Sequence, residues 1–133
     1  MIKYFELQRV SDSFEPELSE AINRVIKSGW YIQGNENAKF ESRFAEYCGA
    51  KYCVGTGNGM DALTLIFMAY QQLGIMQPGD EVIVPANTCI ATIIGVLRAG
   101  LKPILCEPCW DTCNINPEKI EECITSRTRA ILP

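Results

Sequence analysis

The chain has 133 residues, a formal net charge of −4 and no histidine. Apolar residues make up 47% of it and charged residues 21%, which is typical of a single globular domain. The lack of histidine excludes Ser-His and Cys-His catalytic pairs and histidine metal ligands. The mild acidity, without a run of Lys or Arg, argues against nucleic-acid binding, and no apolar run reaches the length of a membrane span.

Two helices are predicted in the first part of the chain. Apolar residues at spacings of three and four predict a helix over residues 16–28 that ends at Gly29. An aromatic loop over residues 30–34 follows, and residues 37–47 are predicted to form the second helix. We expect its aromatic side chains to face inward; they are Phe40, Phe44 and Tyr47.

Strands and helices are predicted to alternate from residue 51 onward. The predicted strands cover residues 51–55, 81–85, 102–106 and 129–133, and the helices cover 60–72, 89–99 and a short segment that begins at Asn116-Pro117. This alternation is typical of right-handed crossovers in an α/β fold with a buried parallel sheet. A buried strand at a terminus usually leads into further crossovers, so we expect residues 1–133 to be one segment of a larger domain. The alternative is a complete small domain whose last strand is an edge.

Cysteine usage indicates a reducing compartment. The number of cysteines is odd and no secretory signal precedes them, so we expect free thiols and a cytoplasmic location. The spacing of Cys106, Cys109 and Cys113 resembles that of thiolate ligands of zinc, but the chain has no second closely spaced pair. We therefore expect ordinary reduced side chains and no metal. The seven cysteines are Cys48, Cys53, Cys89, Cys106, Cys109, Cys113 and Cys123.

The glycine-rich turn before the helix predicted over 60–72 is the strongest candidate site. Glycines allow a close approach of the backbone, and unpaired N–H groups at a helix start bind anions, so we expect a phosphate here. The turn lacks the Gly-Lys-Ser/Thr of a P-loop, and Met60 stands where a dinucleotide fingerprint needs its third glycine. A tight turn without a ligand is the alternative.

Two further segments are candidates for ligand contacts. Asn87, Thr88 and Thr92 follow the strand predicted over 81–85, and ligands of open parallel sheets bind beyond the carboxyl ends of the strands. Helix capping explains the same residues without a ligand. The adjacent aromatic residues Trp30 and Tyr31 are suited to stack on a planar ring, to pack across an interface, or to cover a helix end.

The order and spacing of these motifs resemble the N-terminal part of the DegT/DnrJ/EryC1/StrS family of sugar aminotransferases. The resemblance implies a fold of the aspartate-aminotransferase type, with a three-layer large domain, and the cofactor pyridoxal 5′-phosphate. The matching segments are Ser28-Gly29-Trp30-Tyr31-Ile32-x-Gly34, Phe40-Glu41-x-x-Phe44-Ala45-x-Tyr47-Cys48-Gly49, Gly57-Asn58-Gly59-Met60-Asp61-Ala62-Leu63, Pro78-Gly79-Asp80-Glu81-Val82-Ile83-Val84-Pro85, Asn87-Thr88-Cys89-Ile90-Ala91-Thr92 and Ile124-Thr125-x-x-Thr128-x-Ala130-Ile131.

The resemblance assigns roles to five positions. Asn58, Gly59 and Met60 would hold the cofactor phosphate, chiefly through backbone N–H groups. Cys89 stands where the family usually places an aromatic residue or histidine against the pyridine ring, and Tyr31 would lie near the substrate. The implied substrates are a nucleotide-linked keto-deoxysugar and glutamate, for polysaccharide or glycosylated products, and the implied assembly is a homodimer.

Three positions depart from the family pattern. Cys89 cannot stack like a ring, Met60 lacks the hydroxyl of the usual threonine or serine, and Cys113 stands where tyrosine is common.

The catalytic residues of the family are expected beyond residue 133. These are the Schiff-base lysine and the carboxylate that protonates the pyridine nitrogen. None of the chain's lysines has the family's lysine context, so we expect an N-terminal segment that is inactive alone. The alternative is a non-catalytic α/β module that binds a phosphorylated ligand or a partner protein. The lysines are Lys3, Lys27, Lys39, Lys51, Lys102 and Lys119.

Overall fold

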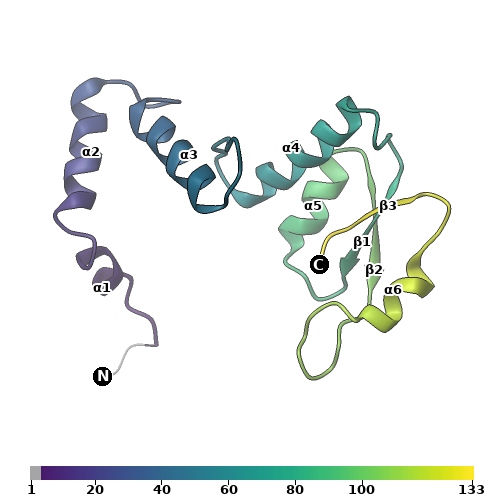
Figure 1. Ribbon diagram of the computed structural model, residues 1–133. Coiled ribbons are helices and arrows are strands. Elements are labelled where there is room, and N and C mark those ends of the chain that lie inside the picture. The colour runs from purple at the N-terminus through teal and green to yellow at the C-terminus, as the bar shows by residue number, and fades with distance from the viewer. Residues whose placement is uncertain (1–3) are drawn as a thin grey trace. The chain divides into compact units, whose positions relative to one another are not determined.

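The computed structural model describes residues 4–133 (Figure 1). The chain divides into two compact units, Met1–Gly55 and Thr56–Pro133. The first unit is helical and the second contains the parallel sheet. We describe each unit by itself.

The helical unit contains α1 (Leu7–Asp12), α2 (Glu17–Ser28) and α3 (Asn35–Tyr47). Helix α2 has acidic residues in its first turn and Lys27 in its last, which suits the helix dipole. It ends where Gly29 adopts a left-handed conformation with φ of 66°. The structure thus confirms both helices predicted here and adds α1, which the sequence analysis did not predict.

The apolar faces of the helical unit remain exposed. Phe40 and Phe44 stack with ring centroids 5.4 Å apart, yet 55% and 46% of their surfaces are accessible. Tyr47 is 86% exposed. The prediction that these three aromatic residues face inward is therefore wrong. Among the described residues of this unit, only Ala45 is buried, so no second layer covers the aromatic face.

The second unit is an α/β layer structure. In chain order it contains α4 (Gly59–Gln72), β1 (Glu81–Pro85), α5 (Ile90–Arg98), β2 (Lys102–Cys106), α6 (Pro117–Cys123) and β3 (Thr128–Ile131). The strands form a parallel sheet in the order β2-β1-β3, with Ile83 opposite Ile104 and Ile131. The predicted α/β fold class is confirmed.

The core of the second unit lies around the central strand. Every residue of β1 is buried, because β1 has a strand on each side and apolar residues above it. Helices α4 and α5 pack closely at Gly95, where an added Cβ atom would lie 3.2 Å from the Leu63 Cβ. The buried apolar cluster consists of Phe67, Met76, Val82, Val84, Val96, Ala99 and Leu101.

Residues 51–55 do not form the predicted strand. Tyr52 and Val54 are 75% and 77% exposed, and the Gly55 N–H donates to the Glu41 carboxylate at 2.7 Å instead of to a neighbouring strand. No strand in the described part of the chain pairs with this segment. A strand needs such a partner for its backbone groups, so its apolar composition alone is not sufficient.

Candidate functional site

The glycine-rich turn leads directly into α4, as its sequence predicts. Asn58 is extended and forms the N-cap of the helix: its side-chain oxygen accepts from the Asp61 N–H at 2.9 Å, and its amide nitrogen donates to the Asp61 carboxylate at 2.8 Å. The Thr56 hydroxyl donates to the Asn58 carbonyl at 3.1 Å. The Asn58 side chain therefore shapes the helix start and is occupied by the cap.

Two backbone donors at this helix start remain unpaired. The N–H groups of Gly59 and Met60 donate to no acceptor in the part of the chain that the structure describes. Gly59 is exposed, and a Cβ atom added to it would meet nothing within 4 Å. These donors lie at the positive end of the helix dipole, so the turn is open to an anion.

An ion pair reduces the negative charge beside this turn. The Asp61 carboxylate lies 3.8 Å from where a Cβ of Gly57 would be, and on its own it would repel an anion. Arg98 from the last turn of α5 pairs with it at 3.1 Å. Both side chains are largely exposed, so the pair adds little stability and acts mainly on the local charge.

Helices α4 and α5 run in the same direction. The Thr64 hydroxyl lies 3.4 Å from the Gly95 carbonyl, and farther along both helices Gln71 donates to the Ala99 carbonyl at 2.6 Å. Because the contacts advance along both segments together, the two helix N-termini lie on the same side of the crossing at Gly95. The structure thus places the turn at Asn58 and the N-cap residue of α5, Cys89, at the same end of the helix pair.

Cys89 is exposed and its thiol makes no cap hydrogen bond. Its carbonyl accepts from the Thr92 N–H at 2.9 Å, and the Thr88 and Thr92 hydroxyls are hydrogen-bonded at 3.0 Å. The threonines therefore support the start of α5 and leave Cys89 accessible. Thr92 is a helix residue, but the N-cap of α5 is Cys89 and no described side chain caps the helix, so the alternative that Asn87 or Thr88 serves as its cap is wrong.

A small hollow lies where β1 ends. It has a volume of 250 Å³ and is lined by Pro85, Asn87, Thr88, Cys113 and Ile115, among others. The Asn87 side chain donates to the Cys113 carbonyl at 2.9 Å and so ties the β1–α5 loop to the loop after β2. Sequence reasoning missed this link, because the two residues are 26 positions apart and neither carries a recognisable pairing signal.

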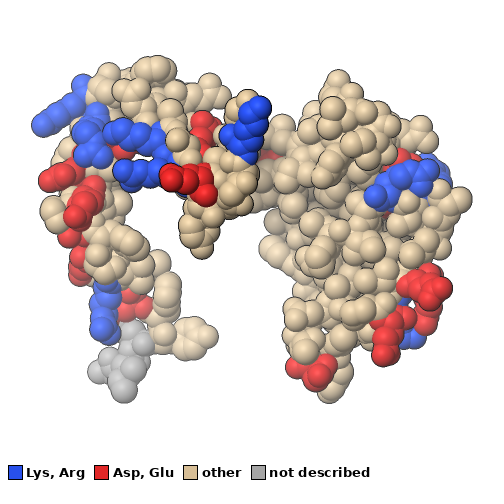
Figure 2. Space-filling model, in the orientation of Figure 1, with Lys and Arg blue, Asp and Glu red and all other residues tan. Residues whose placement is uncertain are grey.

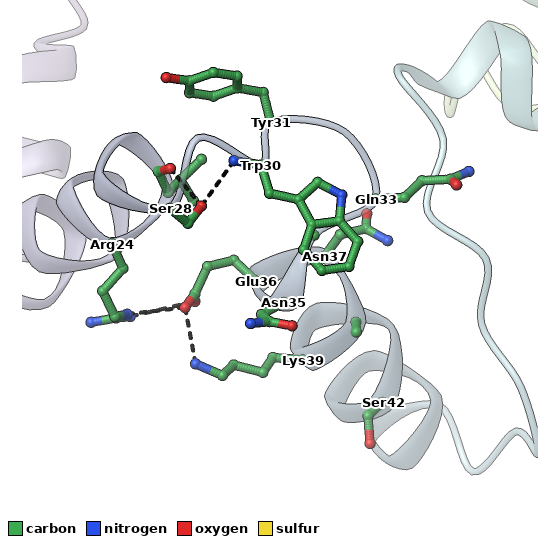
Figure 3. A pocket seen from close by; sticks show the side chains of 13 residues that line it. Arg24, Ser28, Trp30, Tyr31, Gln33, Asn35, Glu36, Asn37, Lys39 and Ser42 are labelled. Carbon is green, nitrogen blue, oxygen red and sulfur yellow. Dashed lines mark hydrogen bonds and ion pairs between the residues drawn. The ribbon is translucent and has the colours of Figure 1, made fainter.

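Tyr31 lies in the helical unit, where it lines a larger hollow of 620 Å³ between α2 and α3 (Figure 3). Trp30 also lines this hollow, and both its backbone and its ring lie close to Gly34. A Cβ atom added at Gly34 would lie 2.9 Å from the Trp30 carbonyl oxygen and 3.6 Å from the Trp30 ring. A larger residue at Gly34 would clash with the Trp30 carbonyl and force the backbone of the loop to shift. The predicted aromatic loop is therefore held in shape by its final glycine.

Three charged residues that the sequence analysis did not single out border this hollow. The Arg24 guanidinium donates to the Glu36 carboxylate at 3.0 and 3.4 Å, and the Lys39 ammonium donates to it at 2.9 Å (Figure 3). These hydrogen bonds lower the pKa of Glu36 from 4.5 to about 2. The spacing of three residues between Glu36 and Lys39 on one helix is a sequence signal for their ion pair. The ion pair of Glu36 with Arg24, 12 residues away, has no such signal in the sequence.

The cysteines do not gather into a metal site. No group of three or more potential ligands among residues 4–133 could hold a metal ion. Cys106 is buried, and burial together with the neighbouring Cys123 thiol raises its pKa. In the same described range, no helix is long and apolar enough to cross a membrane.

The chain is similar in sequence and fold to several known proteins. The chain is 53% identical over 132 residues to dTDP-3-amino-3,6-dideoxy-alpha-D-galactopyranose transaminase of Aneurinibacillus thermoaerophilus, a match covering 99% of this chain and 35% of that protein. The crystal structure of S. venezuelae DesV in complex with a ketimine intermediate matches with a TM-score of 0.86 and 42% identity, over 99% of this chain and 34% of that one.

A third match is the structure of E. coli GDP-4-keto-6-deoxy-D-mannose-3-dehydratase with bound hydrated PLP. Its TM-score is 0.75 and its identity 30%, over 85% of this chain and 30% of that one. The chain thus spans about a third of the length of these relatives. The model of the DegT/DnrJ/EryC1/StrS aminotransferase family matches residues 12–133, and the chain belongs to that family.

Proposed function

We propose that this chain forms the N-terminal part of a pyridoxal-phosphate-dependent aminotransferase that transfers an amino group from glutamate to a nucleotide-linked keto-deoxysugar. Family membership and the transaminase relatives support the reaction class, and a bound PLP in one related structure supports the cofactor. The observation that carries the proposal is the open helix start at α4, with the unpaired N–H groups of Gly59 and Met60.

The residues of this turn fit the phosphate of the cofactor. Gly59 and Met60 would donate their backbone N–H groups, while Asn58 would fix the helix start through its cap. The loss of a hydroxyl at Met60 is tolerable because the binding groups belong to the backbone. Cys89 would lie beside the cofactor ring without stacking on it. When bound, the cofactor supplies an electron sink for carbanion chemistry.

The lysines of the second unit are unsuited to act on this cofactor. Lys102 begins β2, at the end of the sheet opposite the carboxyl ends of the strands, and pairs with Glu81 at 3.1 Å. Lys119 pairs with Glu122 at 2.8 Å on α6. Lys3 lies outside the described residues. We therefore expect these 133 residues alone to show no transamination.

The proposal includes a homodimer and a cytoplasmic location. The exposed apolar residues of α2 and α3 support association with other protein surface, since such faces are rarely left in water. The seven free cysteines support a reducing compartment. Tyr31 would contribute to the substrate site from its hollow in the helical unit.

The proposed phosphate site can be tested by removing one backbone donor. Gly59 is the first residue of α4, a position that favours proline, and Asn58 before it is extended, as proline requires. Gly59→Pro should therefore preserve the helix and delete one N–H. We expect the affinity for pyridoxal phosphate, measured by titration of the cofactor's absorbance, to fall about tenfold or more, as for a hydrogen bond to a charged group.

The matched control is Gly59→Ala. It retains the N–H and adds a Cβ atom in open space, so the affinity should stay within about twofold of the original, a change well below one hydrogen bond. Circular dichroism of both variants verifies that α4 is intact. Equal affinities of the proline and alanine variants would contradict the assignment of this turn to the cofactor phosphate.

A further inference from the structure

Two cysteines from different elements lie close together in the second unit. Cys106 is the last residue of β2, Cys123 is the last residue of α6, and α6 packs against β2 (Figure 1). The Cys123 thiol donates to the Leu105 carbonyl at 3.8 Å, and that carbonyl belongs to the peptide group that precedes Cys106. The Cys106 thiol donates to the carbonyl of Asn116, the N-cap of α6, at 3.8 Å. Each thiol therefore reaches the element that carries the other.

The two thiols differ in their access to solvent. Cys106 is 1% exposed, whereas Cys123 is partly exposed. Burial raises the pKa of Cys106, and so do contact with the Cys123 thiol and the nearby carboxylates, so Cys106 stays protonated near neutral pH. An oxidant in solution therefore meets Cys123 first. Cysteines in contact across packed elements can be joined by a disulfide, since Cα atoms up to about 7 Å apart are within reach of one.

The charge around α6 favours an uncharged oxidant. The helix carries Glu118, Glu121 and Glu122 against the single cation Lys119, which pairs with Glu122 at 2.8 Å. Figure 2 shows acidic side chains gathered over this part of the second unit. A negative surface repels anionic oxidants such as glutathione disulfide but does not repel hydrogen peroxide, which is neutral. The surroundings of Cys123 thus suit a peroxide.

We propose that Cys106 and Cys123 form a disulfide that hydrogen peroxide induces and that fastens α6 to β2. The Cys123 sulfur attacks one oxygen of the peroxide, the O–O bond breaks, and a sulfenic acid forms as the first water leaves. The Cys106 sulfur then attacks the sulfenic sulfur. An S–S bond forms, the S–O bond breaks, and the departing hydroxide takes the Cys106 proton to form the second water. Two thiols thereby lose two electrons, and the peroxide is reduced to two waters.

The disulfide fastens the base of the loop over residues 107–116. This loop leaves β2 after Cys106 and reaches α6 at Asn116. Within it, the Cys113 carbonyl accepts from the Asn87 side chain at 2.9 Å. A cross-link between the two ends of such a segment limits the conformations open to it, so oxidation should slow the local opening of α6. The inference goes beyond the proposed function, because it involves neither the cofactor nor a sugar.

Mapping of the thiols after oxidation tests the pairing. The chain is treated with hydrogen peroxide, the remaining thiols are alkylated, and the peptides of a non-reducing digest are identified by mass spectrometry. We expect one pair of peptides joined through Cys106 and Cys123, lighter by two hydrogen atoms and separated again by dithiothreitol. The proposal is overturned if both thiols stay reduced, if Cys123 ends as a sulfinic acid, or if either cysteine joins a different one.

Serine variants supply the matched control. Cys123→Ser removes the partly exposed thiol, and Cys106 should then stay reduced under the same treatment because it is buried. Cys109→Ser with Cys113→Ser removes two thiols from the loop between them and should leave the yield of the joined peptides unchanged. An equal loss of the joined peptides in this double variant overturns the proposal.

Hydrogen exchange gives a measurement that needs no variant. Peptides that cover α6 should exchange about tenfold or more slowly in the oxidised chain than in the reduced chain, and reduction should restore the faster rate. Peptides of α2, in the other unit, should exchange at the same rate in both forms. Equal exchange of α6 before and after oxidation would contradict the inference that the disulfide fastens this helix.

Discussion

Glu36 is the residue whose ionisation is most strongly shifted. Its pKa is lowered to about 2, first by the Arg24 hydrogen bond and then by Lys39. A carboxylate with a lowered pKa in the folded state contributes stability above its ordinary value of 4.5, and that contribution is lost as the pH falls toward about 2. Because Glu36 is only partly buried and both cations are about half exposed, added salt screens the effect.

The residue-scale prediction follows from this shift. The Glu36 carboxyl should titrate near pH 2 by NMR, and the free energy of unfolding should decline between pH 4.5 and about 2. Glu36→Gln should remove its part of that decline. Glu46→Gln, an exposed carboxylate on the same helix, should retain it. Titration of Glu36 near its ordinary pKa of 4.5 would show that Arg24 and Lys39 do not pair with it in solution.

At the scale of elements, the contact of α4 with α5 positions the candidate cofactor site. A Cβ at Gly95 would lie 3.2 Å from the Leu63 Cβ and 3.3 Å from the Met60 carbonyl. Both contacts belong to the first turns of α4, beside the unpaired donors. A side chain at Gly95 would therefore push the two helix N-termini apart as well as strain the core.

We expect Gly95→Val to lower the free energy of unfolding by about 1–3 kcal/mol, as is usual for overpacking. Gly59→Val is the matched control, because it places the same side chain on a helix where nothing lies within 4 Å. Urea denaturation of both variants gives the comparison. Similar stabilities would mean that the helix pair is loosely packed at Gly95.

At the scale of the whole molecule, the two units differ in how much they bury. In the second unit Val82, Ile83 and Val84 are completely buried, whereas among residues 4–55 Ala45 is the one buried residue. Small units with little buried apolar surface are marginally stable. The helical unit, taken by itself, thus has little to resist local unfolding.

Hydrogen exchange should report this difference. The amides of β1 should exchange slowest, near the global free energy of unfolding, and those of α2 and α3 should exchange much faster. Mass spectrometry of peptides from the two units measures both sets in one experiment. Comparable protection of α2 and β1 would indicate that the apolar face of α2 is covered in solution.

Much of the fold was predictable from local signals. The ends of α2 follow from its apolar period and Gly29, and the start of α4 follows from the glycine-rich turn before residue 60. The alternation after residue 51 predicted a parallel sheet, and the motif order predicted the family; both were confirmed. Each of these signals depends on neighbouring residues within one segment or on the order of the segments. Both can be read directly from the amino-acid sequence.

Only the tertiary structure decided what depends on distant residues. Residues 51–55 have a strand-like composition but no paired strand, and Phe40 and Phe44 have a core-like spacing but no layer opposite them. The Arg24–Glu36 pair and the Asn87 link to Cys113 join positions 12 and 26 residues apart. Burial, strand pairing and ion pairing are set by whatever chain lies across from a residue, and no local pattern specifies that neighbour.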